Sequence, residues 1–165
     1  MTDLVIRSAT PEDVPQILRF IRALAEYERE PESAIATEAD LLRDGFTEPR
    51  RFHCLIAGWQ GKPAGFALYF HNYSTWRGRH GIHIEDLFVL SELRGKGIGK
   101  ALLTSVAAIA QEQGCQRLQW DVLEWNTPAI GFYEKIGATM LAEWRTMRVD
   151  HTGLPALAAT APSCD

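Results

Sequence analysis

The chain has 165 residues, which is enough for one domain with a sizeable hydrophobic core. Its formal net charge of −4 argues against a non-specific nucleic-acid-binding protein, because such proteins normally present a basic face. No apolar run approaches the roughly 18 residues of a membrane span, and the opening MTDLVIRSAT lacks a signal-peptide pattern, so we expect a cytoplasmic protein outside membranes.

The first half of the chain predicts a strand, two helices and then a run of strands. A short strand begins at Leu4, and Thr10 and Thr37 each start a helix, because an acid follows three residues after each threonine N-cap. Apolar residues at helical spacing carry the first helix to about Tyr27, and Gly45 ends the second. Further strands are expected over residues 52–59, 64–73 and 81–90, with a loop over residues 74–81.

The second half of the chain alternates helices with strands. One helix is expected from Ile98 to about Gln113, where Gly114 ends it, and another from Thr127 to about Gly137. Because the consecutive strands before them must pair antiparallel, the order predicts one mixed sheet with helices on both faces and excludes a doubly wound dinucleotide fold. A strand is expected over residues 118–123 and extended structure over 140–149, with residues 1–150 forming a single domain and residues 151–165 a loose tail.

The stretch LRGKGIGKALL, residues 93–103, predicts an anion site. Its three glycines alternate with basic residues at the start of a helix, where successive N–H groups and the helix dipole bind anionic oxygens. A nucleotide P-loop needs Ser or Thr after its lysine, but Lys100 is followed by Ala101, which disfavours an ATP-binding protein. A dinucleotide fingerprint needs glycine where Lys100 lies. The alternative is a strand-to-helix turn with solubilising charges.

The pattern R-G-x-G-I-G-x-x-L-L resembles the acetyl-CoA-binding motif of the GNAT acetyltransferases. Segments such as EDLFV and EWN.P.I.FY narrow the resemblance to the spermidine/spermine (diamine) acetyltransferases and their thialysine-acetylating relatives. The resemblance covers roughly residues 5–149 and implies the GNAT fold, a mixed, mostly antiparallel sheet of six to seven strands with helices on both faces. It also implies acetyl-CoA as co-substrate, a small polyamine or diamine as acceptor, and a homodimer.

The resemblance also implies where acetyl-CoA binds. The glycine loop would hold the pyrophosphate, and the backbone near the end of the third central strand would hold the carbonyl and the pantetheine. The implied cofactor-binding residues are Leu87, Phe88, Val89, Arg94, Gly95, Lys96, Gly97, Ile98, Gly99, Lys100, Asn126, Thr127, Pro128, Ala129 and Tyr133.

Acetyl transfer to an amine requires a base, because an amine of pKa about 10.4 is almost wholly protonated at pH 7. The pair Glu85-Asp86 interrupts an apolar strand, where a carboxylate is costly unless it is paired or functional. An acid that faces the sheet edge or pairs with backbone N–H groups is the alternative interpretation. The resemblance makes Glu85 the base or the ligand of the cation, acting through water.

The leaving thiolate requires a proton. By spacing alone, Ile130, Tyr133 and Ile136 could form a core stripe, but the resemblance makes Tyr133 the group that protonates the thiolate. From reference pKa values this transfer is uphill by about 1.5 units, or roughly 2 kcal/mol. The site must therefore favour the tyrosinate or couple the transfer to collapse of the intermediate.

The acceptor site is also assigned by resemblance. Aromatic and acidic groups suit a multiply charged amine through cation–π contacts and charge pairing. The chain departs from the family at Ile136, where the family has an arginine that touches the cofactor, and Lys135 and Arg94 are the substitutes. The segment before Trp144 is also shorter, so Glu143 matches only loosely. The implied acceptor-binding residues are Tyr27, Glu28, Glu85, Gln119, Trp120, Asp121 and Glu143.

Two other functions remain open. A thialysine, amino-acid or other small-amine acetyltransferase would need a cation for the substrate carboxylate, which Arg77 or Arg79 could supply. A non-catalytic acetyl-CoA-binding module is disfavoured by the presence of both Glu85 and Tyr133.

Neither metal nor cysteine chemistry is expected. The pair His80 and His83 has weak metal spacing without a third ligand, so we expect no metal. Three widely spaced cysteines, Cys54, Cys115 and Cys164, form no CxxC motif and are expected to be free thiols in a reducing compartment.

Overall fold

The computed structural model describes residues 3–162, so Cys164 lies outside the described residues. Contacts divide the chain into two compact units, Met1–Leu123 and Glu124–Asp165. The first unit contains β1 (Leu4–Ser8), α1 (Val14–Tyr27), α2 (Glu38–Phe46), β2 (His53–Trp59), β3 (Lys62–Ser74), β4 (Arg79–Val89), α3 (Ile98–Glu112) and β5 (Leu118–Trp120), with 3₁₀ turns at Pro11–Asp13, Pro31–Ser33 and Ser91–Leu93. The second unit contains α4 (Thr127–Lys135) and α5 (Leu154–Ala158).

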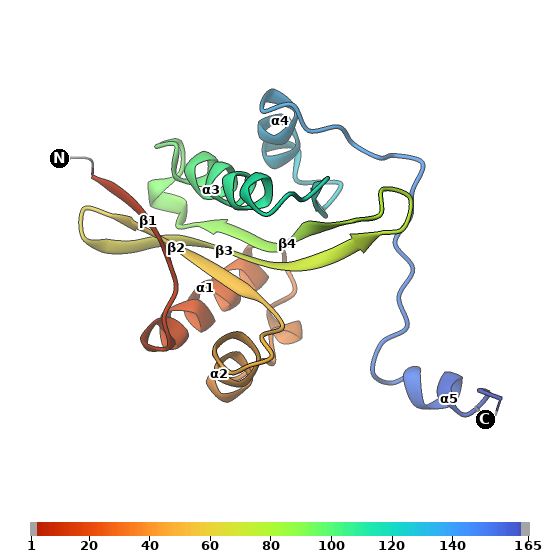
Figure 1. The fold of residues 1–165 in the computed structure, drawn as a ribbon. Coiled ribbons are helices and arrows are strands. Elements are labelled where there is room, and N and C mark those ends of the chain that lie inside the picture. Colours follow the sequence, from red (N-terminus) through yellow and green to blue (C-terminus); the bar gives the residue numbers. More distant parts are fainter. Residues whose placement is uncertain (1–2, 163–165) are drawn as a thin grey trace. The chain divides into compact units, whose positions relative to one another are not determined.

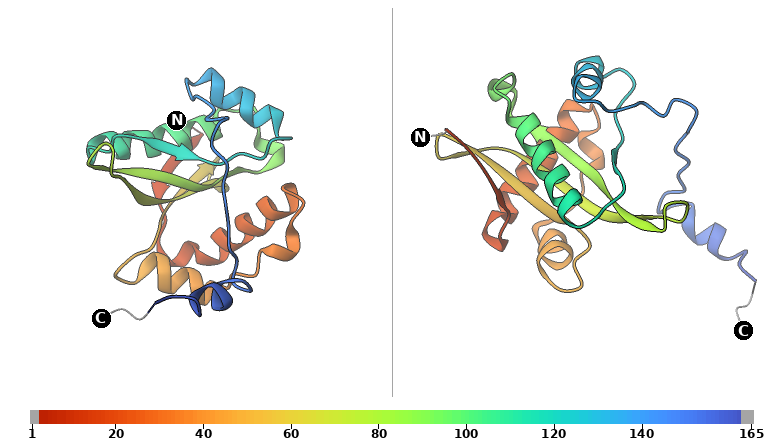
Figure 2. Two further views of the ribbon diagram at one scale, coloured as in Figure 1. Left: turned by 90° about the vertical axis from the view of Figure 1, so that its right-hand side faces the viewer. Right: turned by 45° about the horizontal axis from the view of Figure 1, so that its top comes forward.

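The first unit is built on one mixed sheet with the strand order β1-β2-β3-β4-β5. The first four strands pair antiparallel with their neighbours, and β5 runs parallel to β4 after the crossover through α3. Helices α1 and α2 cover one face of the sheet and α3 covers the other (Figures 1 and 2). The prediction of a mixed, mostly antiparallel sheet with helices on both faces is thus confirmed.

Each face of the sheet has its own packed layer. On the face of α1 and α2, the ring of Phe20 stacks on that of Phe66 with 5.5 Å between centroids, inside a cluster that includes Ile17 and Leu68. The other face is covered by α3, whose Ile98, Leu102 and Val106 are almost fully buried. Burial of each such side chain contributes about 1.5–3 kcal/mol to folding. The two layers therefore fix β4, which carries the site, from both sides.

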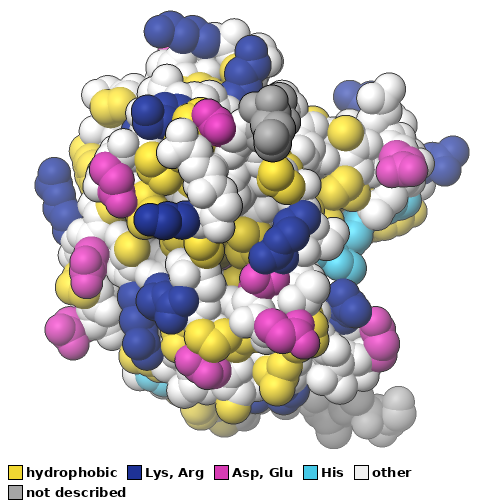
Figure 3. All heavy atoms as spheres, turned by 90° about the vertical axis from the view of Figure 1, so that its left-hand side faces the viewer, with side chains coloured by type: hydrophobic (Ala, Val, Ile, Leu, Met, Phe, Trp, Pro, Cys, Tyr) yellow, Lys and Arg dark blue, Asp and Glu magenta, His cyan; other side chains and the backbone are white. Residues whose placement is uncertain are grey.

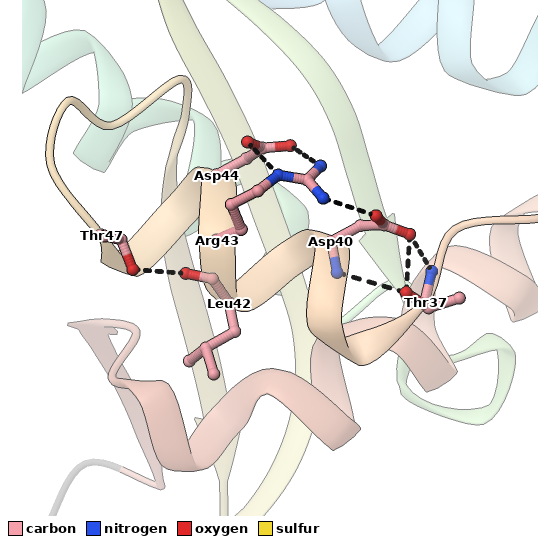
Figure 4. Close-up of polar contacts among 6 residues, drawn as sticks. All are labelled: Thr37, Asp40, Leu42, Arg43, Asp44 and Thr47. Carbon is pink, nitrogen blue, oxygen red and sulfur yellow. Dashed lines mark hydrogen bonds and ion pairs between the residues drawn. The ribbon is translucent and has the colours of Figure 1, made fainter.

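Both predicted N-caps are present. The Asp40 N–H donates to Thr37 Oγ1 at 3.2 Å, and Thr37 N–H donates back to the Asp40 carboxylate at 3.0 Å (Figure 4). The Asp40 carboxylate also accepts from Arg43 at 2.9 Å, which strengthens the first turn of α2. At Thr10, the backbone N–H donates to the Asp13 carboxylate at 2.8 Å, and the Asp13 N–H donates to the Thr10 carbonyl oxygen at 2.9 Å. A 3₁₀ turn precedes α1, which begins at Val14.

The structure differs from the sequence-based expectations in strand number and strand limits. The described residues contain five strands in the sheet and not the expected six to seven. β5 ends at Trp120 and not at residue 123, and residues 140–149 contain no strand. β4 begins at Arg79, inside the expected loop, because a turn at residues 75–78, with Gly78 at φ 61°, suffices to reverse the chain.

The C-terminal segment contains a short helix where no structure was assigned. The Asp150 carboxylate accepts hydrogen bonds from the N–H groups of Thr152 and Gly153 at 2.9 and 3.2 Å, which starts a turn that leads into α5. None of the helices among the described residues is long and apolar enough to cross a membrane.

Candidate active site

The glycine loop has the backbone geometry that an anion site requires. Gly95 and Gly97 have φ of 77° and 82°, a region that side-chain-bearing residues rarely adopt. Gly97 is the N-cap of α3, and the first helical hydrogen bond runs from Ala101 N–H to Gly97 O at 2.9 Å. The N–H groups of the first turn before Ala101 therefore have no acceptor within the helix and can donate to a ligand. Lys96 and Lys100 are exposed beside them.

Two basic side chains of this loop lie over aromatic rings of neighbouring elements. The Arg94 guanidinium lies 4.4 Å from the ring centroid of Tyr27, and its Nε–H donates to Val89 O at 3.1 Å. Lys96 Nζ lies 5.6 Å from the ring of Trp59. Arg94 thus links the loop to the end of α1 and to the end of β4. Figure 3 shows the side of the molecule that carries the β2–β3 hairpin and the start of α3, where basic and acidic side chains alternate around apolar ones.

The backbone of Leu87, Phe88 and Val89 has a free edge. The parallel pairing of β4 with β5 covers residues 82–84 of β4 and ends at the pair Ile84 and Trp120. Beyond that pair, β4 continues to Val89 and is held by β3 on its other edge. Among the residues that the structure describes, no strand pairs with this edge of β4 after Ile84, and the Val89 carbonyl accepts from Arg94 Nε–H. The backbone groups that remain unpaired on this edge are available to an extended ligand.

A β-bulge in β4 determines where the acidic residues point. Leu68 pairs with Asp86, whereas the next residue of β3, Tyr69, pairs with Ile84, so Glu85 is the extra residue. Leu68 belongs to the cluster on the α1 face, and paired residues of neighbouring strands share a face. The bulge therefore brings Asp86 to the α1 face.

Of the two acids, Asp86 is partly buried and Glu85 is exposed. Burial raises the pKa of Asp86 to about 7, and the negative charges of Glu85 and Glu28 add to the shift. Burial also raises the pKa of Glu28, at the end of α1. The Glu85 side chain is 58% exposed, and its Oε2 lies 3.8 Å from His83 Nε2. The sequence suggested a buried acid at this pair without showing which of the two it was.

The acceptor residues assigned to the first unit lie on α1, β4 and β5. Tyr27 and Glu28 end α1, and Gln119 and Trp120 lie in β5, with Asp121 following it. Gln119 Nε2 lies 3.5 Å from His83 Nδ1, and the His83 ring stacks on Phe70 with 5.0 Å between centroids. His83 therefore connects Gln119 to Glu85.

Sequence reasoning missed this role of His83, which was considered only as a metal ligand, and it left the role of Asp86 unassigned. The signal for Asp86 was present, since it stands beside Glu85 in an apolar strand. The role of His83 depends on the pairing of β4 with β5, which local sequence does not reveal.

The remaining predicted site residues belong to the second unit and are described separately from those of the first unit. Asn126 is the N-cap of α4 and its carbonyl accepts from Ile130 N–H at 3.1 Å, with Pro128 in the first turn. Tyr133 lies in α4 next to Phe132, with 5.2 Å between ring centroids. Thr127 and Ala129 lie in α4, and Glu143 is exposed in the segment that follows it.

Neither a metal cluster nor a reactive thiol occurs at the site. Within residues 3–162, no three His, Cys, Asp or Glu side chains are grouped so that they could hold a metal ion. Cys54 and Cys115 are free, and burial raises the pKa of both thiols, which lowers their nucleophilicity at neutral pH.

Comparisons with known proteins identify the family and support the fold. Residues 17–138 match the acetyltransferase (GNAT) family. The thialysine N-epsilon-acetyltransferase of Bos taurus is 38% identical, covering 96% of this chain and 99% of that protein. The human spermidine/spermine N(1)-acetyltransferase-like protein 1 is 36% identical over 90% of this chain and 23% of its own length. Among solved structures, an integron cassette protein from the mobile metagenome of V. cholerae superimposes with a TM-score of 0.81 at 30% identity, covering 97% of this chain and 100% of that one.

Proposed function

Since the chain belongs to the GNAT family of N-acetyltransferases, we propose that it transfers the acetyl group of acetyl-CoA to a primary amine of a small polyamine or diamine. The observation that carries the proposal is the joint placement, in one unit, of the glycine loop, the free edge of β4 and the acids at the bulge. This arrangement offers one place for a pyrophosphate, one for an extended chain and one for a cation.

The residues present fit acetyl-CoA. The turn from Gly95 to Lys100 offers free N–H groups and two lysines to the pyrophosphate, and the edge from Leu87 to Val89 offers backbone partners to the amides of the pantetheine. Bound acetyl-CoA supplies an activated carbonyl carbon. Residues 126–129 are proposed as cofactor-binding residues on the family resemblance alone.

The acceptor proposal follows from charge. Glu85 and Glu28 both lie close enough to Asp86 to act on its charge, and Glu28 directly follows Tyr27 at the end of α1. Such a surface suits a flexible molecule with two or more ammonium groups. Gln119, Trp120 and Asp121 extend the proposed acceptor site along β5, and Glu143 is proposed to contribute to it from the second unit.

In the proposed reaction, the neutral amine attacks the thioester carbonyl directly. The carbon–nitrogen bond forms, the carbon–sulfur bond breaks, and the thiolate takes a proton from Tyr133. Glu85 either accepts the proton of the incoming ammonium group or holds that cation while another group accepts it.

A thialysine or other amino-acid acceptor is the second candidate, favoured by the 38% identity to a thialysine acetyltransferase. Arg79 is poorly placed for its carboxylate. Arg79 lies six residues before Glu85 along β4, about 20 Å at 3.3 Å per residue, which is longer than a lysine-sized molecule. Arg94, above the ring of Tyr27, is the basic group that would pair with a carboxylate.

The test is thiol release from acetyl-CoA with spermidine, spermine, diaminopropane, thialysine, lysine and a peptide N-terminus as acceptors. Preference for the polyamines and diamines supports the first proposal, and preference for thialysine or lysine supports the second. Arg94→Gln should then selectively raise KM for amino acids relative to diamines. Acetyl-CoA binding without turnover on any amine would contradict both and support a non-catalytic cofactor-binding module.

We further propose that residues 1–150 act as one acetyltransferase domain in a cytoplasmic homodimer. The cytoplasmic location is supported by the free thiols Cys54 and Cys115. The dimer is supported by large exposed apolar side chains in the C-terminal segment, among them Trp144 at 71% and Met147 at 91% exposure. A second copy of the chain would cover them.

A further inference from the structure

We infer that Asp86 accepts the proton of the incoming ammonium group, while Glu85 holds that group at the exposed rim of the site. The inference rests on the proposed N-acetyltransferase function and adds to it the residue that generates the nucleophile. It divides between two neighbouring acids the tasks that the resemblance assigned to Glu85 alone.

The bulge gives the two acids different environments. Asp86 lies opposite Leu68 on the α1 face and directly precedes Leu87, where the free edge proposed for the cofactor begins. A group at this position is adjacent to the place where a thioester carbonyl would lie. Glu85 is more than half exposed and faces His83 at 3.8 Å, so water and a neighbouring imidazole already surround its carboxylate.

The charges around Asp86 come from several elements. Glu85 on its own strand and Glu28 at the end of α1 both disfavour its ionised form. On β2, Cys54 lies in the same cross-strand row with Leu68 between it and Asp86, and the charge of Asp86 helps to raise the pKa of the Cys54 thiol. From the glycine loop, Arg94 lies over Tyr27, and 5.8 Å from the ring of Phe88.

The magnitudes favour Asp86 as the base. Proton transfer from an amine of pKa about 10.4 to an ordinary carboxylate of pKa about 4.3 is uphill by about 6 units. Transfer to Asp86, with a pKa of about 7, is uphill by about 3 units, and the base is still partly ionised at neutral pH. A base of this kind is therefore better matched to the reaction than an ordinary surface carboxylate.

The proton balance is complete. One proton moves from the ammonium nitrogen to Asp86 and then to water, leaving a neutral amine that attacks the carbonyl carbon. The second proton, lost from nitrogen as the amide forms, offsets the one that the departing sulfur receives through Tyr133. The net products are the acetylated amine, free coenzyme A and one proton.

The experiment compares pH profiles of kcat/KM for the wild type, Asp86→Asn, Glu85→Gln and Glu28→Gln, with Glu112→Gln on the exposed end of α3 as the charge-matched control. We expect the wild-type rate to rise with pH through an apparent pKa near 7. In Asp86→Asn this rising limb of the pH profile should disappear and kcat should fall by about 10²–10⁴-fold. Calorimetry should show that the variant still binds acetyl-CoA. Glu85→Gln should raise KM for the amine and keep the limb.

Substitution of the neighbouring acids tests the role of Asp86 while Asp86 itself is unchanged. Removing the charge of Glu85 or Glu28 should shift the limb to lower pH, because each charge raises the pKa of Asp86. The Glu112 control should not move it. This shift remains measurable even where Asp86→Asn fails to fold.

Loss of the limb in Glu85→Gln, with its retention in Asp86→Asn, would assign the base to Glu85 and overturn the inference. The inference would also be overturned if Asp86→Asn kept both the wild-type kcat and the rise of kcat/KM with pH. If Asp86→Asn does not fold, the inference would be overturned when this rise occurs at the same pH in Glu85→Gln, Glu28→Gln and the wild type. A wild type without acetyl transfer to any amine would instead contradict the proposed function, and the two failures are thus distinguishable.

Discussion

Asp86 links the stability of the protein to pH. Its pKa is about 7 in the folded chain against an ordinary value of 3.8, so between these pH values the folded state binds more protons than the unfolded state. The free energy of unfolding therefore falls as pH rises from about 4 to about 7, by at most about 4 kcal/mol from this group. Below that window both states are protonated and the contribution vanishes.

Asp86→Asn should raise the melting temperature at pH 8 and change it little at pH 4. The amide cannot ionise, so the cost of the buried charge disappears. Thermal unfolding of wild type and variant across pH 4–8 measures the difference, in which the contributions of other groups cancel. A constant difference over this range would contradict the raised pKa.

Tyr133→Phe should lower turnover by about 10²–10⁴-fold and leave acetyl-CoA binding intact, because the proton for the thiolate is removed while the ring is retained. Steady-state thiol release and calorimetry measure the two quantities. Tyr73→Phe, which changes an exposed tyrosine of β3, serves as the control. A near-wild-type rate would remove Tyr133 from its proposed role.

At the scale of elements, the glycine loop and the bulge differ in how far sequence predicts them. The loop and the start of α3 are local features, since glycines at fixed spacing followed by an apolar helical pattern suffice to identify them. The bulge depends on which residue of β3 lies opposite each residue of β4, and pairing register is not visible in either strand alone. For this reason Glu85 was assigned by motif, whereas the role of Asp86 required the structure.

Gly97→Ala should weaken acetyl-CoA binding beyond its effect on folding. A side chain at φ 82° costs about 1–2 kcal/mol and reorients the N–H groups at the start of α3. Gly114→Ala is the matched control, because Gly114 has φ 71° and follows the C-terminal end of α3, at the opposite end of that helix from the glycine loop. Calorimetry and thermal unfolding should show similar loss of stability in both variants and loss of affinity only in Gly97→Ala. Equal affinities would exclude the loop from cofactor binding.

At the scale of the whole molecule, the sequence identified the family and most elements of the first unit, but the expected number of strands, six to seven, was too high. Periodicity alone favours extended structure over residues 140–149, yet a strand also needs a partner, and none pairs with that segment among the described residues. The exposed apolar side chains there are what the proposed homodimer would bury.

Removal of residues 140–165 should therefore convert the protein from dimer to monomer. Light scattering after size exclusion measures the mass of full-length and truncated chains, and circular dichroism shows whether the remaining sheet stays folded. Loss of Trp144, Met147 and their apolar neighbours removes the surface that we expect the second copy to cover. A full-length chain that is monomeric at micromolar concentration would contradict the proposed dimer.

The bulge in β4 has a consequence for the length of the chain. Without Glu85, Ile84 would still pair with Tyr69 and Asp86 with Leu68, now as consecutive residues of β4. The sheet could therefore form with β4 one residue shorter. Glu85 is therefore surplus to the architecture, and relatives that lacked it would keep the same scaffold with a regular ladder and one acid fewer. A single-residue gap at this position would identify chains of the same fold that lack the acid we propose to hold the acceptor.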